Sequence, residues 1–271
     1  MKICILGASK RHQQLYKNLI NNQINAEIYS SWEDVPENIE ADCIVLPIPS
    51  FRKGKLNLPS GCNGVSPSEF VKRTSPSSMI ISVGWNFPQR RTIDLNERDD
   101  FSYLNAVSTA EGAIKIAIDS TEKTLYDTKN AIIGFGRVGK VLADRLKPFG
   151  KVTVCARSDK DIFYAKALGF DVVRLKTLSD KMSSFDIIFQ TVPSLILDEN
   201  NIDKMDENAV IVELSAAGLG TDMEYAKRKK KKAILASALP ENTAPISAGN
   251  VLSECVFNIL SELYEKGDQN E

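Results

Sequence analysis

The feature that most constrains this fold is a glycine-rich turn that joins a strand-like run to a helix-like run. The apolar residues 131–133 lead directly into Gly134, Gly136 and Gly139, and apolar residues then recur at helical spacing. Glycines at this spacing allow a tight turn, close approach of the backbone to a pyrophosphate, and close packing of the helix on the strand. The helix N-terminus adds N–H donors and partial positive charge. We therefore predict a dinucleotide-binding βαβ unit, and a turn of purely structural origin is the alternative.

A second run of the same kind opens the chain. Residues 3–6 are apolar, Gly7 follows, and a helix-like pattern continues to residue 20. Further strand-like runs occur at residues 44–47, 79–84, 152–155, 186–189, 210–214 and 233–236. Because helical or turn segments separate these runs, we predict an α/β fold of two Rossmann-like, doubly wound domains with a cleft between them. The Pro-, Gly- and Ser-rich stretch 47–67 predicts a surface loop.

The sequence also predicts how these domains divide the chain. Residues 1–108 form an N-terminal α/β domain for a substrate or a partner, and residues 109–127 form a connecting helix with Thr109 as its N-cap. Residues 128–246 form the dinucleotide-binding domain. Residues 247–271 form a C-terminal helix, which we expect to pack back toward the first domain.

Composition and charge exclude several classes of protein. The 271 residues are 43% hydrophobic and 25% charged, which is typical of a folded globular protein. Because 34 basic residues nearly balance 35 acidic ones, we expect no nucleic-acid or membrane partner. The basic run 227–232 is interpreted as the end of a helix beside a strand.

Scattered cysteines without CxxC spacing argue against disulfides and zinc. With no signal peptide and no long apolar run, we predict a cytoplasmic protein that holds no metal.

The residues after the second strand of the dinucleotide-binding domain bear on the cofactor. A site specific for NAD would place Asp or Glu there to hold the ribose 2′-hydroxyl. This chain instead has Arg157 and Ser158, with Lys160 nearby, which suit a 2′-phosphate. We predict NADP(H), with NAD(H) as the alternative if Arg157 is only a solvated charge. The predicted cofactor-binding residues are Gly134, Phe135, Gly136, Arg137, Val138, Gly139, Arg157, Ser158, Lys160, Thr191, Val192, Pro193, Ser215, Leu239 and Pro240.

Two segments near the end of the first domain carry a family resemblance. Residues 94–101 read DLNERDDF, and residues 104–114 read LNAVSTAEGAI. Together with the glycine turn at 134–140 and the segment 239–249, they make the chain resemble the family of dipicolinate synthase A chains over nearly its whole length. Four residues at three places depart from the family pattern. Ser9 stands in place of an acidic residue, Ser108 in place of proline, and Glu241-Asn242 in place of a glycine–lysine pair.

The resemblance implies a specific reaction. It implies that the chain is a catalytic subunit that uses NADP to oxidise dihydrodipicolinate to dipicolinate (pyridine-2,6-dicarboxylate) in the mother cell of a sporulating bacterium. It also implies a partner, the smaller, flavoprotein-like second subunit of dipicolinate synthase. Formation of an aromatic pyridine supplies much of the driving force, so the site has mainly to position the ring against the cofactor. For this reason no catalytic acid or base is assigned.

The implied substrate carries two carboxylates, and the fork of an arginine matches a carboxylate. Arg11, which follows the first glycine turn, is the preferred ligand, and Arg90, Arg91 and Arg98 are further candidates. The predicted substrate-binding residues are Arg11, Asn105, Thr109 and Ser247. Each of them also fits an ordinary structural role, as a surface charge, a helix residue or a helix cap.

Other functions remain as alternatives. One is a non-catalytic, NADP-binding regulatory subunit whose first domain docks a partner. Another is a different two-domain NADP oxidoreductase, similar to alanine dehydrogenase or methylene-tetrahydrofolate dehydrogenase. A 2-hydroxyacid dehydrogenase of the His/Glu/Arg type is disfavoured, because His12 is the only histidine and it precedes the cofactor motif. The sequence is also compatible with a homo-oligomer.

Overall fold

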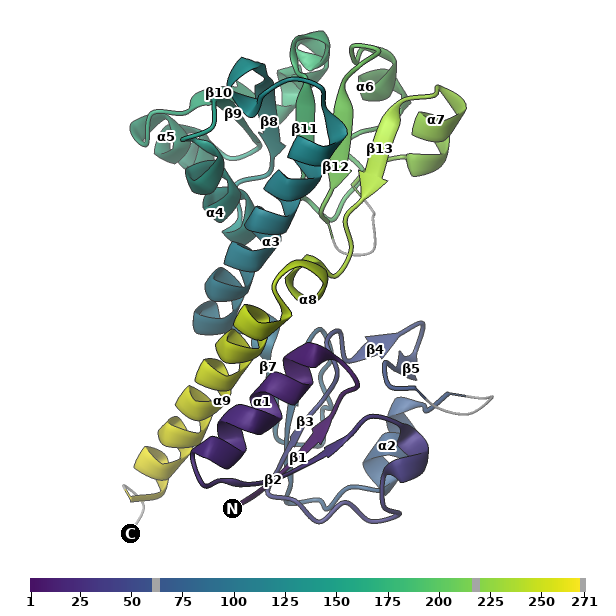
Figure 1. Ribbon diagram of the computed structural model, residues 1–271, viewed down its shortest axis with the longest axis vertical. Helices are drawn as coiled ribbons and strands as arrows, with labels where there is room; N and C mark the ends of the chain where they lie inside the picture. The colour runs from purple at the N-terminus through teal and green to yellow at the C-terminus, as the bar shows by residue number, and fades with distance from the viewer. Residues whose placement is uncertain (60–63, 216–219, 269–271) are drawn as a thin grey trace. The chain divides into compact units, whose positions relative to one another are not determined.

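The computed structural model describes residues 1–59, 64–215 and 220–268, and the chain divides into two compact units (Figure 1). The first unit comprises Met1–Asn105 and Ala244–Glu271, and the second comprises Ala106–Thr243. Each unit is built on one parallel sheet, which confirms the predicted α/β fold class. The divisions predicted after residues 108 and 246 lie three residues beyond the structural ones at 105 and 243.

The sheet of the first unit has five parallel strands in the order β2-β1-β3-β6-β7. These strands are β1 (Lys2–Leu6), β2 (Asn25–Tyr29), β3 (Cys43–Val45), β6 (Met79–Ser82) and β7 (Thr92–Asp94). Two short strands, β4 (Phe51–Arg52) and β5 (Lys55–Leu56), form a separate antiparallel hairpin. The helices are α1 (Lys10–Asn21), α2 (Pro67–Lys72), α9 (Pro245–Asp268) and the start of α3 (Asp99–Ser120), with 3₁₀ turns at Trp32–Asp34 and Leu95–Glu97.

Alternate strand residues of the first unit are buried on opposite faces of its sheet, as a parallel sheet covered on both faces requires. Ile3, Ile5 and Val45 belong to the hydrophobic cluster that α1 and α9 complete. Cys4 and Leu6 belong to the cluster on the other face, to which α2 contributes. Both ends of the chain therefore share one core.

Helices α1 and α9 run side by side although they lie near opposite ends of the sequence (Figure 1). Gln14 and Asn18 of α1 both donate hydrogen bonds to Asn250 of α9, at 3.2 and 3.0 Å. A glycine permits this close approach. A Cβ on Gly249 would clash with the side chain of Gln14 and would lie 2.8 Å from the carbonyl oxygen of Arg11.

Replacing Gly249 by valine is expected to lower the free energy of unfolding by about 2 kcal/mol, because the new side chain would force α9 away from α1. Urea denaturation measures the change. Glu254→Val is the matched control, since it adds an apolar side chain at an exposed position of the same helix. Equal stability of the two variants would show that the helix contact tolerates a side chain at position 249.

The sheet of the second unit has six parallel strands in the order β10-β9-β8-β11-β12-β13. These strands are β8 (Lys129–Ile133), β9 (Lys151–Ala156), β10 (Asp171–Arg174), β11 (Ile187–Gln190), β12 (Val210–Glu213) and β13 (Lys232–Leu235). The helices are the rest of α3, α4 (Arg137–Leu146), α5 (Asp159–Ala167), α6 (Glu199–Asp203), α7 (Met223–Arg228) and α8 (Leu239–Thr243), with 3₁₀ turns at Leu125–Asp127, Leu175–Asp180 and Met182–Ser184.

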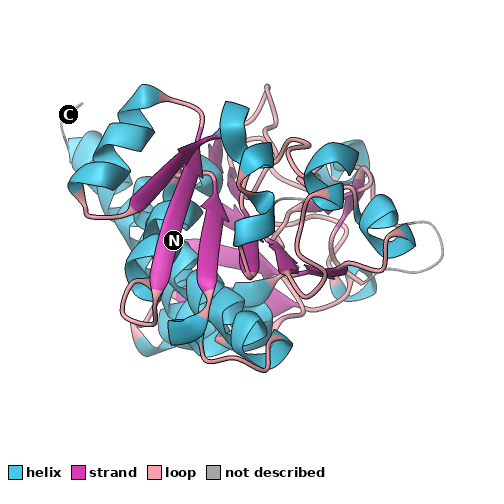
Figure 2. Ribbon diagram, turned by 90° about the horizontal axis from the view of Figure 1, so that it is seen from above, coloured by secondary structure: helices cyan, strands magenta, loops and turns pink. Residues whose placement is uncertain are grey.

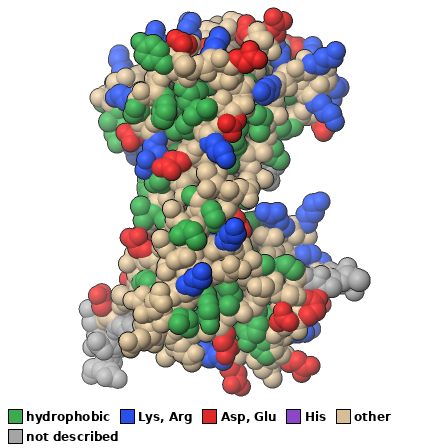
Figure 3. Space-filling model, viewed as in Figure 1, with side chains coloured by type: hydrophobic (Ala, Val, Ile, Leu, Met, Phe, Trp, Pro, Cys, Tyr) green, Lys and Arg blue, Asp and Glu red, His purple; other side chains and the backbone are tan. Residues whose placement is uncertain are grey.

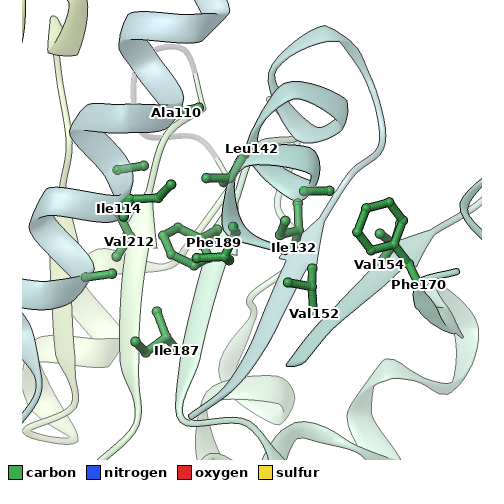
Figure 4. Packing of buried hydrophobic residues seen from close by; sticks show 14 of the residues in the cluster. Ala110, Ile114, Ile132, Leu142, Val152, Val154, Phe170, Ile187, Phe189 and Val212 are labelled. Atoms are coloured by element: carbon green, nitrogen blue, oxygen red, sulfur yellow. The ribbon is translucent and has the colours of Figure 1, made fainter. Parts of the chain in front are cut away.

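The second sheet is also covered on both faces, and Figure 2 shows helices on either side of the strands. On one face, Ile132, Phe189 and Val212 pack with residues of α3 and α4 (Figure 4). On the other face, Ile133 and Ile211 pack with residues of α6 and α7. This three-layer arrangement leaves the ends of the strands as the places where polar residues and ligands can meet.

Two predicted helix starts and one predicted loop are wrong. Thr109 is not an N-cap, because α3 starts at Asp99 and continues without a break through residue 109. Ser247 does not cap the last helix, because α9 already starts at Pro245. The stretch 47–67 is not a plain loop, since it contains the β4–β5 hairpin and the first residue of α2.

Within the ranges that the structure describes, no helix is both long and apolar enough to cross a membrane. The same ranges contain no group of three or more His, Cys, Asp or Glu side chains that could hold a metal ion.

Candidate functional site

The glycine turn lies at the carboxyl end of β8, inside the second sheet. β8 pairs with β9 on one side and with β11 on the other, so the chain connections diverge at this point. Doubly wound sheets bind ligands where their connections diverge. Gly134 has a φ of 99° and donates its N–H to the carbonyl oxygen of Cys155 at 2.8 Å. Gly136 is the N-cap of α4, so the first-turn N–H groups of α4 lie beside the turn.

The glycine turn combines one open position with one crowded position. A Cβ on Gly136 would meet no atom within 4 Å. A Cβ on Gly139 would clash with the carbonyl oxygen of Gly134, so Gly139 is needed for α4 to pack on the turn. The first turn of α4 contains no acidic residue. An open backbone at a helix N-terminus without negative charge fits a bound pyrophosphate.

Two buried polar residues hold the turns next to the glycine turn, and the sequence analysis did not identify them. Gln190 ends β11 and accepts the N–H of Val192 at 2.9 Å, and Glu213 ends β12 and accepts the N–H of Ser215 at 2.8 Å. The two residues are directly opposite in register, and both are fully buried. A polar residue at the end of an otherwise apolar strand is the sequence signal that could have identified them.

The structure divides the remaining predicted cofactor residues into two groups. Thr191 and Val192 lie against the glycine turn, since a Cβ on Gly134 would be 2.5 Å and 2.6 Å from their side chains. The ring of Phe135 instead packs in the hydrophobic core, and Leu239 packs there as well.

The other predicted cofactor residues differ in exposure. Arg137 and Pro193 are exposed, Val138 is half-buried, and Ser215 and Pro240 are buried. Residues 216–218, which we expected to continue the loop after Ser215, lie outside the described residues.

The residues predicted to bind the 2′-phosphate follow β9. Arg157 and Lys160 are exposed. Ser158 is the N-cap of α5, and its Oγ accepts the N–H of Asp161 at 3.1 Å and donates to the Asp161 carboxylate at 2.7 Å. The hydroxyl of Ser158 is therefore already used in capping, which leaves Arg157 and Lys160 as the available donors for a phosphate.

A further arginine contributes to the charge of this region, and the sequence analysis missed it. Arg174 ends β10 directly opposite Ala156 in register, and it forms an ion pair with Asp159. This pairing offsets the negative charge of Asp159 near Arg157. Only the pairing of β10 with β9 brings Arg174 to this position, so no local sequence signal marks it.

In the first unit, the structure brings together two of the predicted substrate-binding residues. Arg11 is 3% exposed, and its Nη2 donates to Oδ1 of Asn105 at 3.3 Å. Thr109 falls in the second unit, and Ser247 is exposed in the first turn of α9.

Two of the other three candidate arginines have structural partners. Arg98 forms ion pairs with Asp100 at 2.8 Å and with Glu262 at 2.6 Å, which join α3 to α9. The guanidinium of Arg90 donates to the carbonyl oxygen of Ser75. Arg91 is exposed and lies directly before β7, at the amino end of that strand, whereas Arg11 follows the carboxyl end of β1. Arg11 therefore remains the preferred candidate at the carboxyl edge of the sheet.

His12 is buried beside the first glycine turn. Its Nδ1 lies 2.8 Å from Oγ of Ser9, and its ring packs so closely on Gly7 that a Cβ at residue 7 would clash with it. Burial lowers the pKa of His12 to about 4, and the charge of Arg11 acts in the same direction to a lesser degree. A hydrogen bond to the backbone of Leu46 has a smaller, opposite effect on this pKa. The imidazole is therefore neutral at neutral pH.

The second unit matches a known family of domains. Residues 105–239 match the family model described as D-isomer specific 2-hydroxyacid dehydrogenase, NAD binding domain. Fold, glycine turn and this match together define a dehydrogenase-like protein with a nicotinamide dinucleotide-binding domain. The domain is thus similar to that of a class disfavoured from the sequence. That class uses a catalytic histidine beyond the cofactor motif, whereas the only histidine of this chain lies in the first unit, in α1.

The whole chain is similar to one particular protein. It is 28% identical to the dipicolinate synthase A chain of Bacillus subtilis, with 97% of both chains covered. A crystal structure of the dipicolinate synthase A chain from Bacillus halodurans superposes with a TM-score of 0.85 at 25% identity, covering 96% of this chain and 97% of that one. A crystal structure of the A chain from Bacillus subtilis gives the same TM-score of 0.85 at 25% identity, covering 98% and 97%. The predicted resemblance is confirmed, and these similarities support an NAD(P)-dependent, oxidoreductase-like role.

Proposed function

We propose that this chain is the catalytic subunit of a dipicolinate synthase, and that it uses NADP to oxidise dihydrodipicolinate to dipicolinate. The observation that carries the proposal is the glycine turn, which is open at Gly136 and closed at Gly139 in a chain similar to a dipicolinate synthase A chain along its whole length. We further propose that its partner is a second, flavoprotein-like subunit, and that it acts in the mother cell during sporulation.

The residues of the chain have separate tasks in this proposal. The first turn of α4 and the glycine turn bind the pyrophosphate, and Arg157 with Lys160 binds the 2′-phosphate. Bound NADP⁺ supplies a hydride acceptor. Arg11, held by its hydrogen bond to Asn105, binds one carboxylate of the substrate and orients the ring. Since loss of a hydride and a proton makes the ring aromatic, orientation contributes more than acid–base assistance.

Turnover of the purified chain tests the reaction. Dihydrodipicolinate and NADP⁺ are mixed with the chain, alone and together with the second subunit, and formation of NADPH and of the pyridine ring is followed by absorbance. We expect both products in equal amounts. Cofactor binding without turnover in either mixture would instead support the regulatory subunit, and turnover of other substrates only would support a different two-domain oxidoreductase.

Arg157→Ala is expected to raise the Michaelis constant for NADP⁺ by about tenfold or more, because a charge-assisted hydrogen bond to phosphate contributes about 1.5–3 kcal/mol. The Michaelis constant for NAD⁺, which has no 2′-phosphate, is expected to stay within about twofold. Lys166→Ala removes an exposed charge from the other end of α5 and is the matched control. Equal constants for both cofactors in every variant would exclude a role of Arg157 in selecting NADP.

A further inference from the structure

The β4–β5 hairpin of the first unit concentrates positive charge. Arg52, Lys53 and Lys55 surround its turn, and all three side chains are exposed. Figure 3 shows Lys and Arg side chains gathered on the side of this unit that carries the hairpin. Within the described ranges, none of the three forms an ion pair. Lys55 acts electrostatically on Glu69, but the carboxylate of Glu69 is hydrogen-bonded to Ser66.

This concentration of charge works against the stability of the hairpin. Arg52 and Lys55 are directly opposite in register, and like charges at such positions repel. Lys53 has a φ of 48° and Gly54 a φ of 72°, which is the left-handed pair of a type I′ turn. Asn or Gly is favoured at the first of these positions, and another residue there costs about 1–2 kcal/mol. Residues that break local rules without a compensating contact are typical of functional sites.

The hairpin is attached to the edge of the sheet where ligands bind. The N–H of Ser50, just before the hairpin, donates to the carbonyl oxygen of Val83 at 3.2 Å, and the N–H of Val83 donates to Oγ of Ser50 at 2.7 Å. Val83 follows β6, so the hairpin is held where β3 and β6 end. Arg11 follows β1, which pairs with β3. Because all five strands are parallel, these groups belong to the same carboxyl edge of one sheet.

Two half-buried aromatic rings lie at the base of the hairpin. The ring centroids of Phe51 and Trp85 are 4.7 Å apart, and Phe87 lies behind Phe51 at 5.9 Å. Aromatic faces of this kind stack on flat rings. The edge therefore combines aromatic surface with two separate sources of positive charge, Arg11 and the hairpin.

We propose that the hairpin binds one carboxylate of a flat ring dicarboxylate and that Arg11 binds the other. This inference rests on the proposed function for the class of substrate. It goes beyond that function by making Arg52, Lys53 and Lys55 the residues that select a second carboxylate. The repulsion among these three cations is relieved when a carboxylate binds between them.

Calorimetric titration of the full chain tests the proposal without turnover. The probes are pyridine-2,6-dicarboxylate and pyridine-2-carboxylate, which differ by one carboxylate. The Arg52→Gln/Lys55→Gln double variant is expected to bind the dicarboxylate about tenfold more weakly and the monocarboxylate within about twofold of wild type. Lys17→Gln/Lys72→Gln removes two exposed charges elsewhere in the same unit, and it is expected to change neither affinity.

Lys53→Asn separates binding from folding. Asparagine suits the left-handed turn position, so the melting temperature is expected to rise while affinity for the dicarboxylate falls. A purely structural role of Lys53 cannot move these two quantities in opposite directions.

The proposal would be overturned if both hairpin variants bound the dicarboxylate with unchanged affinity, or if they lost affinity for the dicarboxylate and the monocarboxylate equally. It would also be overturned if the variants lost only their binding to the second subunit, or if the wild-type chain did not bind the dicarboxylate at all. Selective loss of dicarboxylate binding in a chain without turnover would uphold the binding site and refute the proposed reaction.

Discussion

Gly136→Ala is expected to leave the fold intact and to weaken cofactor binding by roughly 100-fold, or about 2.7 kcal/mol. The new Cβ meets no protein atom within 4 Å, and the backbone at residue 136 has an ordinary φ of −77°. Its effect on the folded chain is the preference for Gly over Ala at an N-cap, which is worth up to about 1 kcal/mol. The methyl group instead occupies the space through which the backbone approaches a pyrophosphate.

Gly139→Ala is the informative comparison. Here the Cβ clashes with the backbone carbonyl of Gly134, so α4 has to move away from the turn. We expect a loss of about 1–3 kcal/mol in the free energy of unfolding together with the loss of cofactor binding. Titration with NADPH, followed by its fluorescence, and urea denaturation measure the two effects. Wild-type cofactor affinity in Gly136→Ala would mean that the turn is purely structural.

The stability of the first unit is expected to fall by about 3 kcal/mol as the pH falls from about 6.5 to about 4. The pKa of His12 is lowered from 6.5 to about 4 in the folded chain. Between these values the unfolded chain binds a proton that the folded chain does not, so protonation favours unfolding. The contribution of the neutral imidazole is fully present above pH 6.5 and is lost as the pH falls through the pKa of the folded state.

The chain offers a clean measurement of this effect. His12 is its only histidine, so no other imidazole titrates in the same range. Both tryptophans, Trp32 and Trp85, lie in the first unit, so their fluorescence during urea denaturation reports on that unit. His12→Asn is expected to be less stable at pH 7 but to lose most of the slope between pH 4 and 6.5, with only the carboxylates near pH 4 still contributing. The same slope in both proteins would assign the pH dependence to other groups.

The sequence predicted the strands that are buried on both faces, but of the four edge strands it predicted only β13. Continuous apolar runs identified β1, β8 and β11, because parallel central strands have no solvent face. β2, β7 and β10 are at or near sheet edges and are short and only partly buried, so their residues carry no clear pattern. Thr109 followed by acidic Glu111 resembled a helix start, but nothing in residues 99–108 interrupts a helix that begins earlier.

The same distinction applies to the candidate site. The glycine turn was predictable because its function depends on the absence of side chains at fixed positions in one short segment. The hydrogen bond between Arg11 and Asn105 was not, because 94 positions separate the two residues. The support of Val192 and Ser215 by Gln190 and Glu213 depends on strand register, which the sequence does not reveal.

The shared core of α1 and α9 has a consequence for synthesis of the chain. Leu252, Val256 and Ile259 of α9 close the cluster begun by Ile3 and Ile5, so the first unit is interrupted by all of residues 106–243. A ribosome therefore synthesises the whole second unit before it reaches α9. Residues 1–105 stay incomplete until α9 has been made, and until then their apolar face is open to chaperones, to other nascent chains, and to aggregation.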